Sequence, residues 1–440
     1  MSRSAPPSTS THPLLSTTFI LHRLAPLHNF PSLKPSDHPS TGRRVTSPFK
    51  HHERALTNLL KGEVLRGVNI GASSDGDNNL SKLGRLRGCK WRLLPTLSAH
   101  RDWIIERESW IGGEEDNDKG GVGEDWALAA QESADVLGVE IMFDYERGGG
   151  GCVAYLLGRP PQYENGQKDK AGAFTSLPLL LTRLPTALVD VLTGYLAQSF
   201  DTLVTPMEAG SGWIEGVLEK YLGEVEHRRR RGTGKDITLS FRTQGVGTGV
   251  KIVTVGIHRG DIADFLNKGK IILAGDDTPK SKRKRDEGPA KPQTQGPFMA
   301  AVEKYMGEMM GIYPGKLRLT KVACGGFVVG GAAGQSPAVA SGAKEKSETE
   351  ATGSAGRVKI FPPRRHIAVD DDEDEEDEED GDADGRMPEE VAVERFLDAV
   401  LQLAGKSFIA TTRDGESGSA AEKRRRVLPV GKAPAGRAGR

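Results

Sequence analysis

The chain has 440 residues, of which 36% are hydrophobic and 6% aromatic, and it contains 55 Gly and 25 Pro. This composition excludes a disulfide-rich or membrane-spanning protein and indicates a globular core diluted by low-complexity insertions. The 60 Lys and Arg residues balance the 60 Asp and Glu residues, so the formal net charge is zero.

In the first half of the chain, strands are predicted where β-forming residues lie between turns, and helices where apolar residues recur every three or four positions. The elements are the strand Thr17–Leu24, the helix His51–Leu65, the strand Lys90–Leu94, the hairpin Gly138–Tyr145 with Cys152–Leu157, a helix after Pro185 and a helix over Gly212–Glu226. Pro185 suits the first turn of its helix, where a backbone N–H is not needed.

The second half of the chain repeats this mixture. Its predicted elements are the strands Ile237–Arg242 and Val250–Ile257, a short helix Ile262–Leu266, the helix Phe298–Met310, the strands Leu317–Cys324, Gly326–Val329 and Val358–Phe361, and the helix Glu389–Leu403. Short glycine turns favour antiparallel pairing. The predicted fold class is therefore α+β, with mostly antiparallel sheets packed against helices and long disordered insertions.

Shifts in composition predict the domain boundaries. The expected order is a disordered tail 1–15, an N-terminal α+β region 16–210, a C-terminal α+β region 211–330 with a disordered linker 275–296, a low-complexity linker 331–356, a segment 357–405 with the last strand, an acidic insert 370–384 and the last helix, and a basic tail 406–440.

Eleven acidic residues follow one another in Asp370–Asp380, and Asp382 and Asp384 extend the run. Adjacent carboxylates repel one another, so the run is predicted to be a solvated, disordered loop. The alternative is an insert that contacts histones or shields a basic surface until DNA displaces it. Without these 13 acids, the 60 basic residues face 47 acidic ones, and the rest of the chain carries a charge of +13.

Two Lys- and Arg-dense clusters have the form of nuclear import signals. They comprise Lys280, Lys282, Arg283, Lys284 and Arg285 in the predicted linker, and Lys423, Arg424, Arg425 and Arg426 in the predicted tail. The first 36 residues contain three basic residues and no acid, which is also typical of a mitochondrial transit peptide, but four prolines interrupt the helix that such a peptide needs. Nuclear residence is therefore the preferred prediction.

Motifs for catalysis, cofactors or metals are not supported. Gly245–Gly249 lies between two predicted strands, so it is predicted to be a hairpin loop and not a nucleotide loop. Asp380–Gly385 resembles half of an EF-hand loop, but Val391 stands where a closing Glu is required. The three isolated cysteines are predicted to be reduced core thiols: Cys89, Cys152 and Cys324. No enzyme activity, cofactor or metal is expected.

Two arginine sites are candidates for contact with a nucleic-acid backbone. Arg228, Arg229, Arg230 and Arg231 follow a predicted helix, where cations favour the helix dipole, but four in a row exceed what capping needs and suit phosphates. Arg183 lies between apolar residues and two prolines. It is interpreted as either a salt-bridged surface residue or a phosphate contact at the rim of a sheet.

Several segments resemble the CENP-L family of inner-kinetochore subunits, in the form found in fungi. They are Thr18–Leu27, Glu63–Val68, Trp91–Pro95 and, most specifically, Phe174–Pro185 followed by Phe200–Pro206. The resemblance implies a non-enzymatic scaffold that pairs with CENP-N in the constitutive centromere-associated network on CENP-A chromatin. It also implies pairing through C-terminal strands that extend a sheet, and a positively charged passage for centromeric DNA.

The edge for such a partner is expected on a late strand, because these strands are apolar and flanked by predicted linkers. The candidate residues are Leu317, Leu319, Val322, Phe327, Val328, Val329, Val358 and Ile360. The alternative is ordinary internal pairing of these strands.

The leading hypothesis is a kinetochore subunit that binds a CENP-N-like subunit, other inner-kinetochore subunits, and centromeric DNA or a nucleosome, with no membrane and no small-molecule substrate. A nuclear histone- or DNA-binding regulator that uses the acidic run is the alternative, and an enzyme is third.

Overall fold

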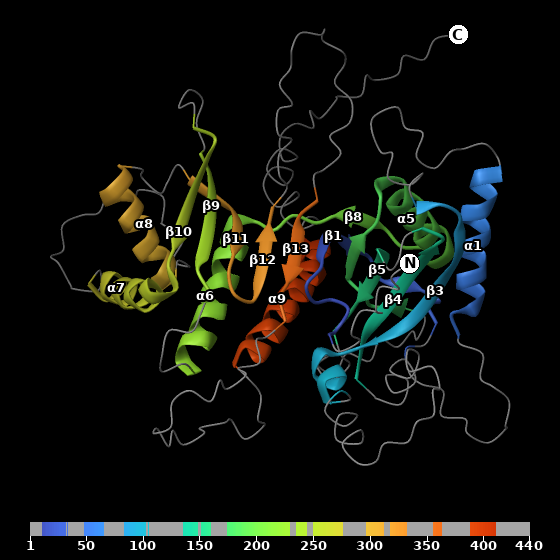
Figure 1. Ribbon diagram of the computed structural model, residues 1–440, viewed down its shortest axis with the longest axis horizontal. Coiled ribbons are helices and arrows are strands. Elements are labelled where there is room, and N and C mark those ends of the chain that lie inside the picture. Colours follow the sequence, from blue (N-terminus) through green and yellow to red (C-terminus); the bar gives the residue numbers. More distant parts are fainter. Residues whose placement is uncertain are drawn as a thin grey trace, which may run out of the picture.

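The computed structural model describes a long sheet with helices on its faces (Figure 1). The described residues are 11–31, 33, 48–65, 83–102, 104, 135–147, 151–159, 174–228, 235–243, 250–275, 296–311, 317–331, 355–362 and 388–410. The acidic run Asp370–Asp380 and the basic clusters Lys280–Arg285 and Lys423–Arg426 lie outside these residues.

Most predicted elements are present at or near their predicted positions. The strands are β1 (Thr18–Leu24), β2 (Leu27–His28), β3 (Leu86–Pro95), β4 (Val136–Tyr145), β5 (Cys152–Leu157), β6 (Phe174–Thr175), β7 (Leu179–Arg183), β8 (Val204–Pro206), β9 (Ile237–Thr243), β10 (Ile252–Ile257), β11 (Leu317–Ala323), β12 (Phe327–Gly330) and β13 (Arg357–Ile360). The helices are α1 (Lys50–Leu65), α5 (Thr186–Phe200), α6 (Ser211–Arg228), α7 (Ile262–Gly275), α8 (Pro297–Met310) and α9 (Pro388–Ala410). Pro185 is the N-cap of α5, one position before the predicted first turn.

One antiparallel sheet runs through the molecule in the order β10-β9-β11-β12-β13-β1-β7-β5-β4-β3, and β8 pairs with β1 beside this path. The first strand of the chain lies in the middle of it: Ile20 of β1 is opposite Thr182 of β7 on one side and Arg357 of β13 on the other. The α+β class and the antiparallel pairing are confirmed. This one sheet contains strands from both sides of residue 210, where the sequence suggests a boundary between two regions.

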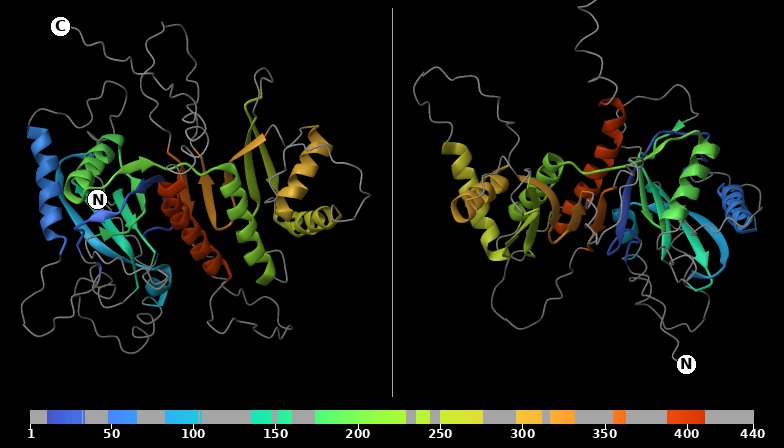
Figure 2. Two further views of the ribbon diagram at one scale, coloured as in Figure 1. Left: turned by 180° about the vertical axis from the view of Figure 1, so that it is seen from behind. Right: turned by 90° about the horizontal axis from the view of Figure 1, so that it is seen from above.

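Two apolar cores lie on the two faces of the sheet. In β5, Val153, Tyr155 and Leu157 join the larger core, while the alternate residues join the smaller one. The larger core also holds the buried faces of β9 to β13 and of α6, α7, α8 and α9, and the smaller core lies under α1 and α5. From behind, α6 and α9 lie side by side in front of the strands that face the viewer in Figure 1 (Figure 2).

Helix α9 fixes the middle of the sheet. Its buried residues recur at helical spacing, as the sequence predicts, and they include Val393, Phe396, Leu397, Val400 and Leu401. Phe396 contacts Phe327 of β12, which Tyr221 of α6 also meets edge-on, with ring centroids 5.3 Å apart. The helix continues to Ala410, beyond its predicted end at Leu403.

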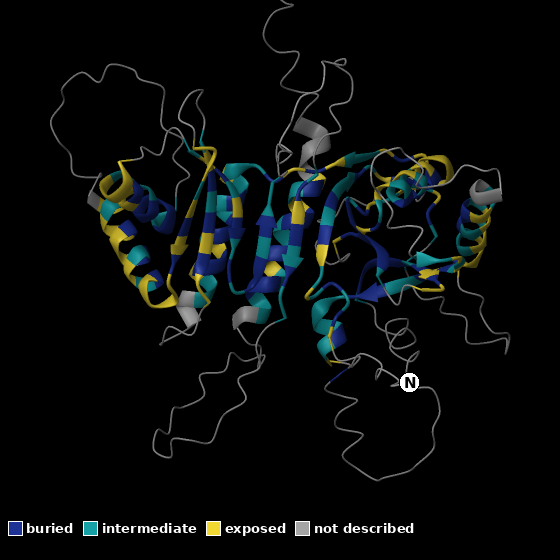
Figure 3. Cartoon of the chain, turned by 45° about the horizontal axis from the view of Figure 1, so that its top comes forward, coloured by how far each residue is buried: buried dark blue, intermediate teal, exposed yellow. Residues whose placement is uncertain are grey.

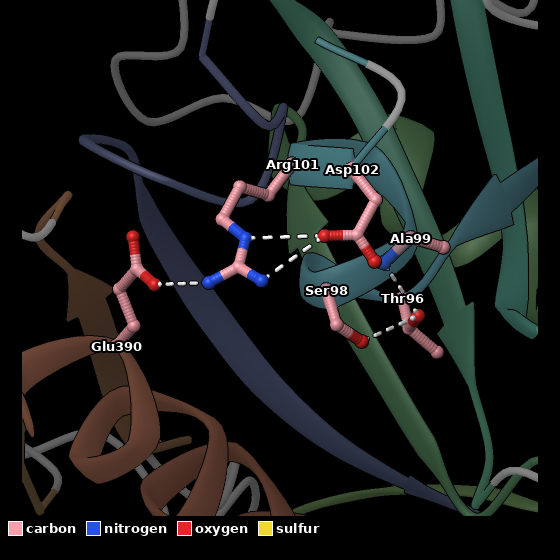
Figure 4. Close-up of polar contacts among 6 residues, drawn as sticks. All are labelled: Thr96, Ser98, Ala99, Arg101, Asp102 and Glu390. Carbon is pink, nitrogen blue, oxygen red and sulfur yellow. Dashed lines mark hydrogen bonds and ion pairs between the residues drawn. The ribbon is translucent and has the colours of Figure 1, made fainter. Parts of the chain in front are cut away.

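An ion pair joins the first turn of α9 to the N-terminal half of the chain (Figure 4). Arg101, in the helical segment 97–102, donates from Nη1 to Oε2 of Glu390 at 2.8 Å and from Nε to Oδ1 of Asp102 at 3.2 Å. The start of that segment is capped by Thr96, whose Oγ1 accepts from the N–H of Ala99 at 3.2 Å. The pair therefore connects parts of the chain that are 289 residues apart.

The cysteine prediction is confirmed. Cys89, Cys152 and Cys324 are buried free thiols. Burial raises the pKa of Cys89 to about 11 and that of Cys324 to about 12, so these thiols stay protonated at neutral pH.

The expected partner edge is wrong. β11 pairs with β9 and β12, β12 with β11 and β13, and β13 with β12 and β1. All the candidate edge residues therefore belong to internal strands: Leu317, Leu319, Val322, Phe327, Val328, Val329, Val358 and Ile360. The reason is that β1 occupies the open side of β13, and this long-range pairing leaves no local signal. Among the described strands, the two ends of the sheet are β10 and β3.

Candidate nucleic-acid interface

The C-terminal half of the sheet has one buried face and one face that carries exposed cations. Side chains alternate between the two faces of a strand. In β11, Leu319 and Val322 are buried against the helices, whereas Arg318 and Lys321 are exposed. Figure 3 shows the same alternation of buried and exposed residues along the neighbouring strands.

The same pattern places five cations on the open face, here called the basic face: Arg242, Arg318, Lys321, Arg357 and Lys359. Lys321 and Arg357 are both opposite Gly330 of β12, one from each side. They are therefore two strand spacings apart, about 10 Å. Because Gly330 has no side chain, no side chain of β12 stands between these two cations at this position.

Negative charge is missing from these strands. Strands β1 and β9 to β13 contain no Asp or Glu. Within the described part of the chain, none of the five cations of the basic face forms an ion pair. A surface of one sign concentrates counter-ions and attracts anionic partners. The arrangement is suited to a polyanion such as a nucleic-acid backbone.

An aromatic ring organises one end of the basic face. The Nζ atoms of Lys235 and Lys359 lie 4.8 and 5.1 Å from the centroid of the Phe361 ring. The backbone N–H of Phe361 donates to Gly326 at 2.8 Å, which holds the ring at the end of β12. Cation–π attraction keeps both ammonium groups at this end, so Lys235 extends the basic face.

The arginines expected from the sequence do not gather on this face. Arg183 is exposed at the end of β7, but it is opposite Val153, which points into the larger core. Arg183 therefore projects on the other face of the sheet. Arg228 ends α6, and Arg229, Arg230 and Arg231 lie outside the described residues. Their contact with a phosphate backbone stays a prediction.

The sequence contains a signal for the basic face that the prediction did not use. In Leu317–Ala323 and Arg357–Ile360, cations alternate with apolar residues and acids are missing. Such alternation is typical of a strand with one buried face and one cationic face. The prediction relied instead on the four consecutive arginines Arg228–Arg231.

A groove of about 530 Å³ lies between α6 and α9. Its floor is apolar and includes Val217, Tyr221 and Phe396. Two of its charged groups, Arg395 and Glu224, form an ion pair with each other across the groove. This pair links the two helices, and the groove has the character of a helix–helix contact.

Membrane-spanning helices and metal-binding clusters are both absent from the residues that the structure describes. In that part of the chain, no helix has the length and apolarity required to cross a membrane. Over the same residues, no cluster of three His, Cys, Asp or Glu side chains could hold a metal ion.

The sequence of the chain matches a known protein family. The family model described as CENP-L, Centromere protein L, matches residues 13–405, a range that includes both cores and the basic face. No curated protein matches the chain. The fungal form of the resemblance stays a prediction.

Proposed function

Because the chain belongs to the centromere protein L family, whose members are structural subunits of the inner kinetochore, we propose that it pairs with a CENP-N-like partner and holds the DNA backbone during chromosome segregation. The family is structural, not enzymatic. Its members reside at centromeres in the nucleus, and the clusters Lys280–Arg285 and Lys423–Arg426 are proposed to direct import.

The observation that carries the DNA proposal is the basic face. Its five cations project from strands without any acid, on the side of the sheet opposite α6 and α9. Each phosphate that such a face neutralises releases counter-ions, which favours binding. Contacts of this kind position a duplex without reading its bases. This suits a scaffold that holds centromeric DNA whatever its sequence.

The test is binding of a mixed-sequence DNA duplex to a variant with Lys321→Ala, Arg357→Ala and Lys359→Ala. The slope of log affinity against log salt is expected to flatten by up to about 2.7, because each lost phosphate contact contributes about 0.9.

A matched control changes three cations of α7 and α8, which lie outside the basic face: Lys268, Lys270 and Lys304. This control is expected to keep the slope of the unmodified protein. If the two triple variants have equal slopes, the basic face is not the DNA-binding surface.

The second part of the proposal is that β10 is the edge to which the partner adds a strand. An added strand is the mode of association in which main-chain hydrogen bonds provide affinity. Strand β10 contains no charge and no proline, and Ile252 on it is 57% exposed. Edges of this kind are otherwise blocked in proteins, since they attract further strands.

The other end of the sheet is protected. Strand β3 carries Lys90 and Arg92, ends in Pro95, and has register shifts at Leu86/Gly88 and at Leu94/Pro95. Charges, proline and bulges are the features that prevent pairing at an edge. The contrast between the two ends supports β10 as the partner edge.

The hydrogen bonds of β10 identify its outward groups. The N–H of Thr243 donates to the carbonyl of Lys251, so this pair is hydrogen-bonded across β9 and β10. Such pairs alternate with pairs whose main-chain groups point away. Ile252, Thr254 and Gly256 therefore present their N–H and C=O groups to the free side of β10.

A further inference from the structure

Two arginines of the basic face are direct cross-strand neighbours. Arg318 of β11 is opposite Arg242 of β9. Both side chains are exposed, and both alternate with buried residues, Leu319 and Phe241, so they project on the same open face. Directly opposite residues have Cβ atoms about 4.5–5.5 Å apart. The two guanidinium groups therefore share one small region of the surface.

Nothing in the described part of the chain offsets this repulsion. Like charges placed directly opposite each other destabilise a sheet. On its other side Arg242 faces Ile252 of β10, and neither arginine forms an ion pair among the described residues. An anion seated between the two groups would convert the repulsion into attraction.

We propose that Arg242 and Arg318 form a clamp for a single phosphate of the DNA backbone. A guanidinium group is planar and donates two parallel hydrogen bonds to phosphate oxygens. A phosphodiester has two non-bridging oxygens, and each oxygen can accept one hydrogen bond from each arginine. This inference rests on the proposed DNA contact and adds that two cations serve one phosphate.

A register shift lies beside the arginine pair and supports a functional role for this position. The pairing of β11 with β9 shifts between Leu319 and Lys321, directly after Arg318. Such irregularities bend a strand and re-aim its side chains, and they are common beside functional sites.

The test compares Arg242→Thr, Arg318→Thr and the double variant for binding of a mixed-sequence duplex over a range of salt. Threonine suits an exposed strand position. Each single change is expected to lower affinity about tenfold, and the double change to add little, because the clamp acts as a unit. The salt slope of the double variant is expected to flatten by about 0.9, the value for one phosphate.

Arg318→Lys tests the geometry. Lysine keeps the charge but loses the paired donors, so affinity is expected to fall while the salt slope stays that of the unmodified protein. A melting temperature measured without DNA provides an independent readout. Each threonine variant is expected to melt at or above the temperature of the unmodified protein, because the repulsion is relieved; a lower temperature would overturn the premise.

The outcomes separate the clamp from the wider proposal. Additive losses with a slope change of about 1.8 would mean two separate phosphates and would refute the clamp. Unchanged binding in these variants, together with a flattened slope after the changes at Lys321, Arg357 and Lys359, would refute the clamp and retain the DNA contact. Unchanged binding in both sets would refute both.

Discussion

Phe396 of α9 stacks on Phe327 of β12, with ring centroids 4.0 Å apart and ring planes at 10° to each other. Both side chains are buried, at 2% and 0% exposure. The stack lies in the larger core, which also contains residues of β1 and β7. It therefore fastens the last helix to the middle of a sheet whose strands come from both ends of the chain.

Phe396→Ala is expected to lower the free energy of unfolding by about 3–5 kcal/mol, because it removes a buried ring and leaves a cavity under α9. Urea denaturation followed by circular dichroism measures the change. Tyr305→Ala on α8, where the side chain is 39% exposed, is the control and is expected to cost less. A loss below about 1 kcal/mol for Phe396→Ala would mean that α9 is not held by this core.

The pair Arg101–Glu390 is expected to contribute a small coupling energy. Both side chains are 24% exposed, so a double-mutant cycle with Arg101→Gln and Glu390→Gln should give about 0.5–1 kcal/mol, falling as salt is raised. The same cycle on the exposed pair Lys304–Glu308 is the control, with an expected coupling of about 0.3 kcal/mol. Equal couplings would show that the link between α9 and the N-terminal half adds nothing.

His12 is expected to make stability depend on pH. Burial lowers the pKa of His12 from 6.5 to about 3, with a smaller contribution from His100, whose ring centroid is 5.0 Å away. A histidine with a lowered native pKa binds its proton in the unfolded state first. Its contribution to stability is therefore present above pH 6.5 and is lost as pH falls toward 3.

The measurement compares the unmodified protein with His12→Gln at several pH values. The stability difference between them is expected to shrink by up to about 1.4 kcal/mol per pH unit below 6.5. His258→Gln, at an exposed position, is the control. A difference that does not change with pH would show that His12 takes up its proton in the folded protein.

Thr254→Pro is expected to abolish binding of a CENP-N-like partner without unfolding the chain. The change removes an outward N–H of β10 and leaves the hydrogen bonds to β9 in place, which is the position where an edge strand tolerates proline. Co-purification and a melting curve measure the two effects. Thr254→Ala keeps the N–H and should bind; if the proline variant also binds, the partner uses another surface.

Local structure could be predicted from the sequence wherever the spacing of apolar residues and the positions of turn residues indicated the same element. The strand over Thr17–Leu24 was predicted from its β-forming residues, the hairpin of β4 and β5 from alternation, and the helix that carries Phe396 from helical spacing. Strand β7 was not, because its apolar part, Leu179–Leu181, is a short unbroken run next to Pro178, and such runs lack a period.

Strand order could not be predicted, and the partner edge depended on it. Nothing near Val358 indicates that its neighbour is Phe19, and this pairing is what closes the candidate edge. The cations of the basic face also form one surface only because of the strand order β9-β11-β12-β13. This order brings Arg242 beside Arg318 and Lys321 near Arg357. The residues were visible in the sequence, but their proximity was not.

The central position of β1 also affects how the chain folds during its synthesis. Ile20 and Arg357 pair in the sheet although they are 337 residues apart. At ribosomal speeds of about 5–20 residues per second, β1 waits roughly 20–70 s for β13 to be synthesised. During that interval the side of β1 that will meet β13 is open to other nascent chains, so a chaperone or a rapidly translated message would protect the yield of this protein.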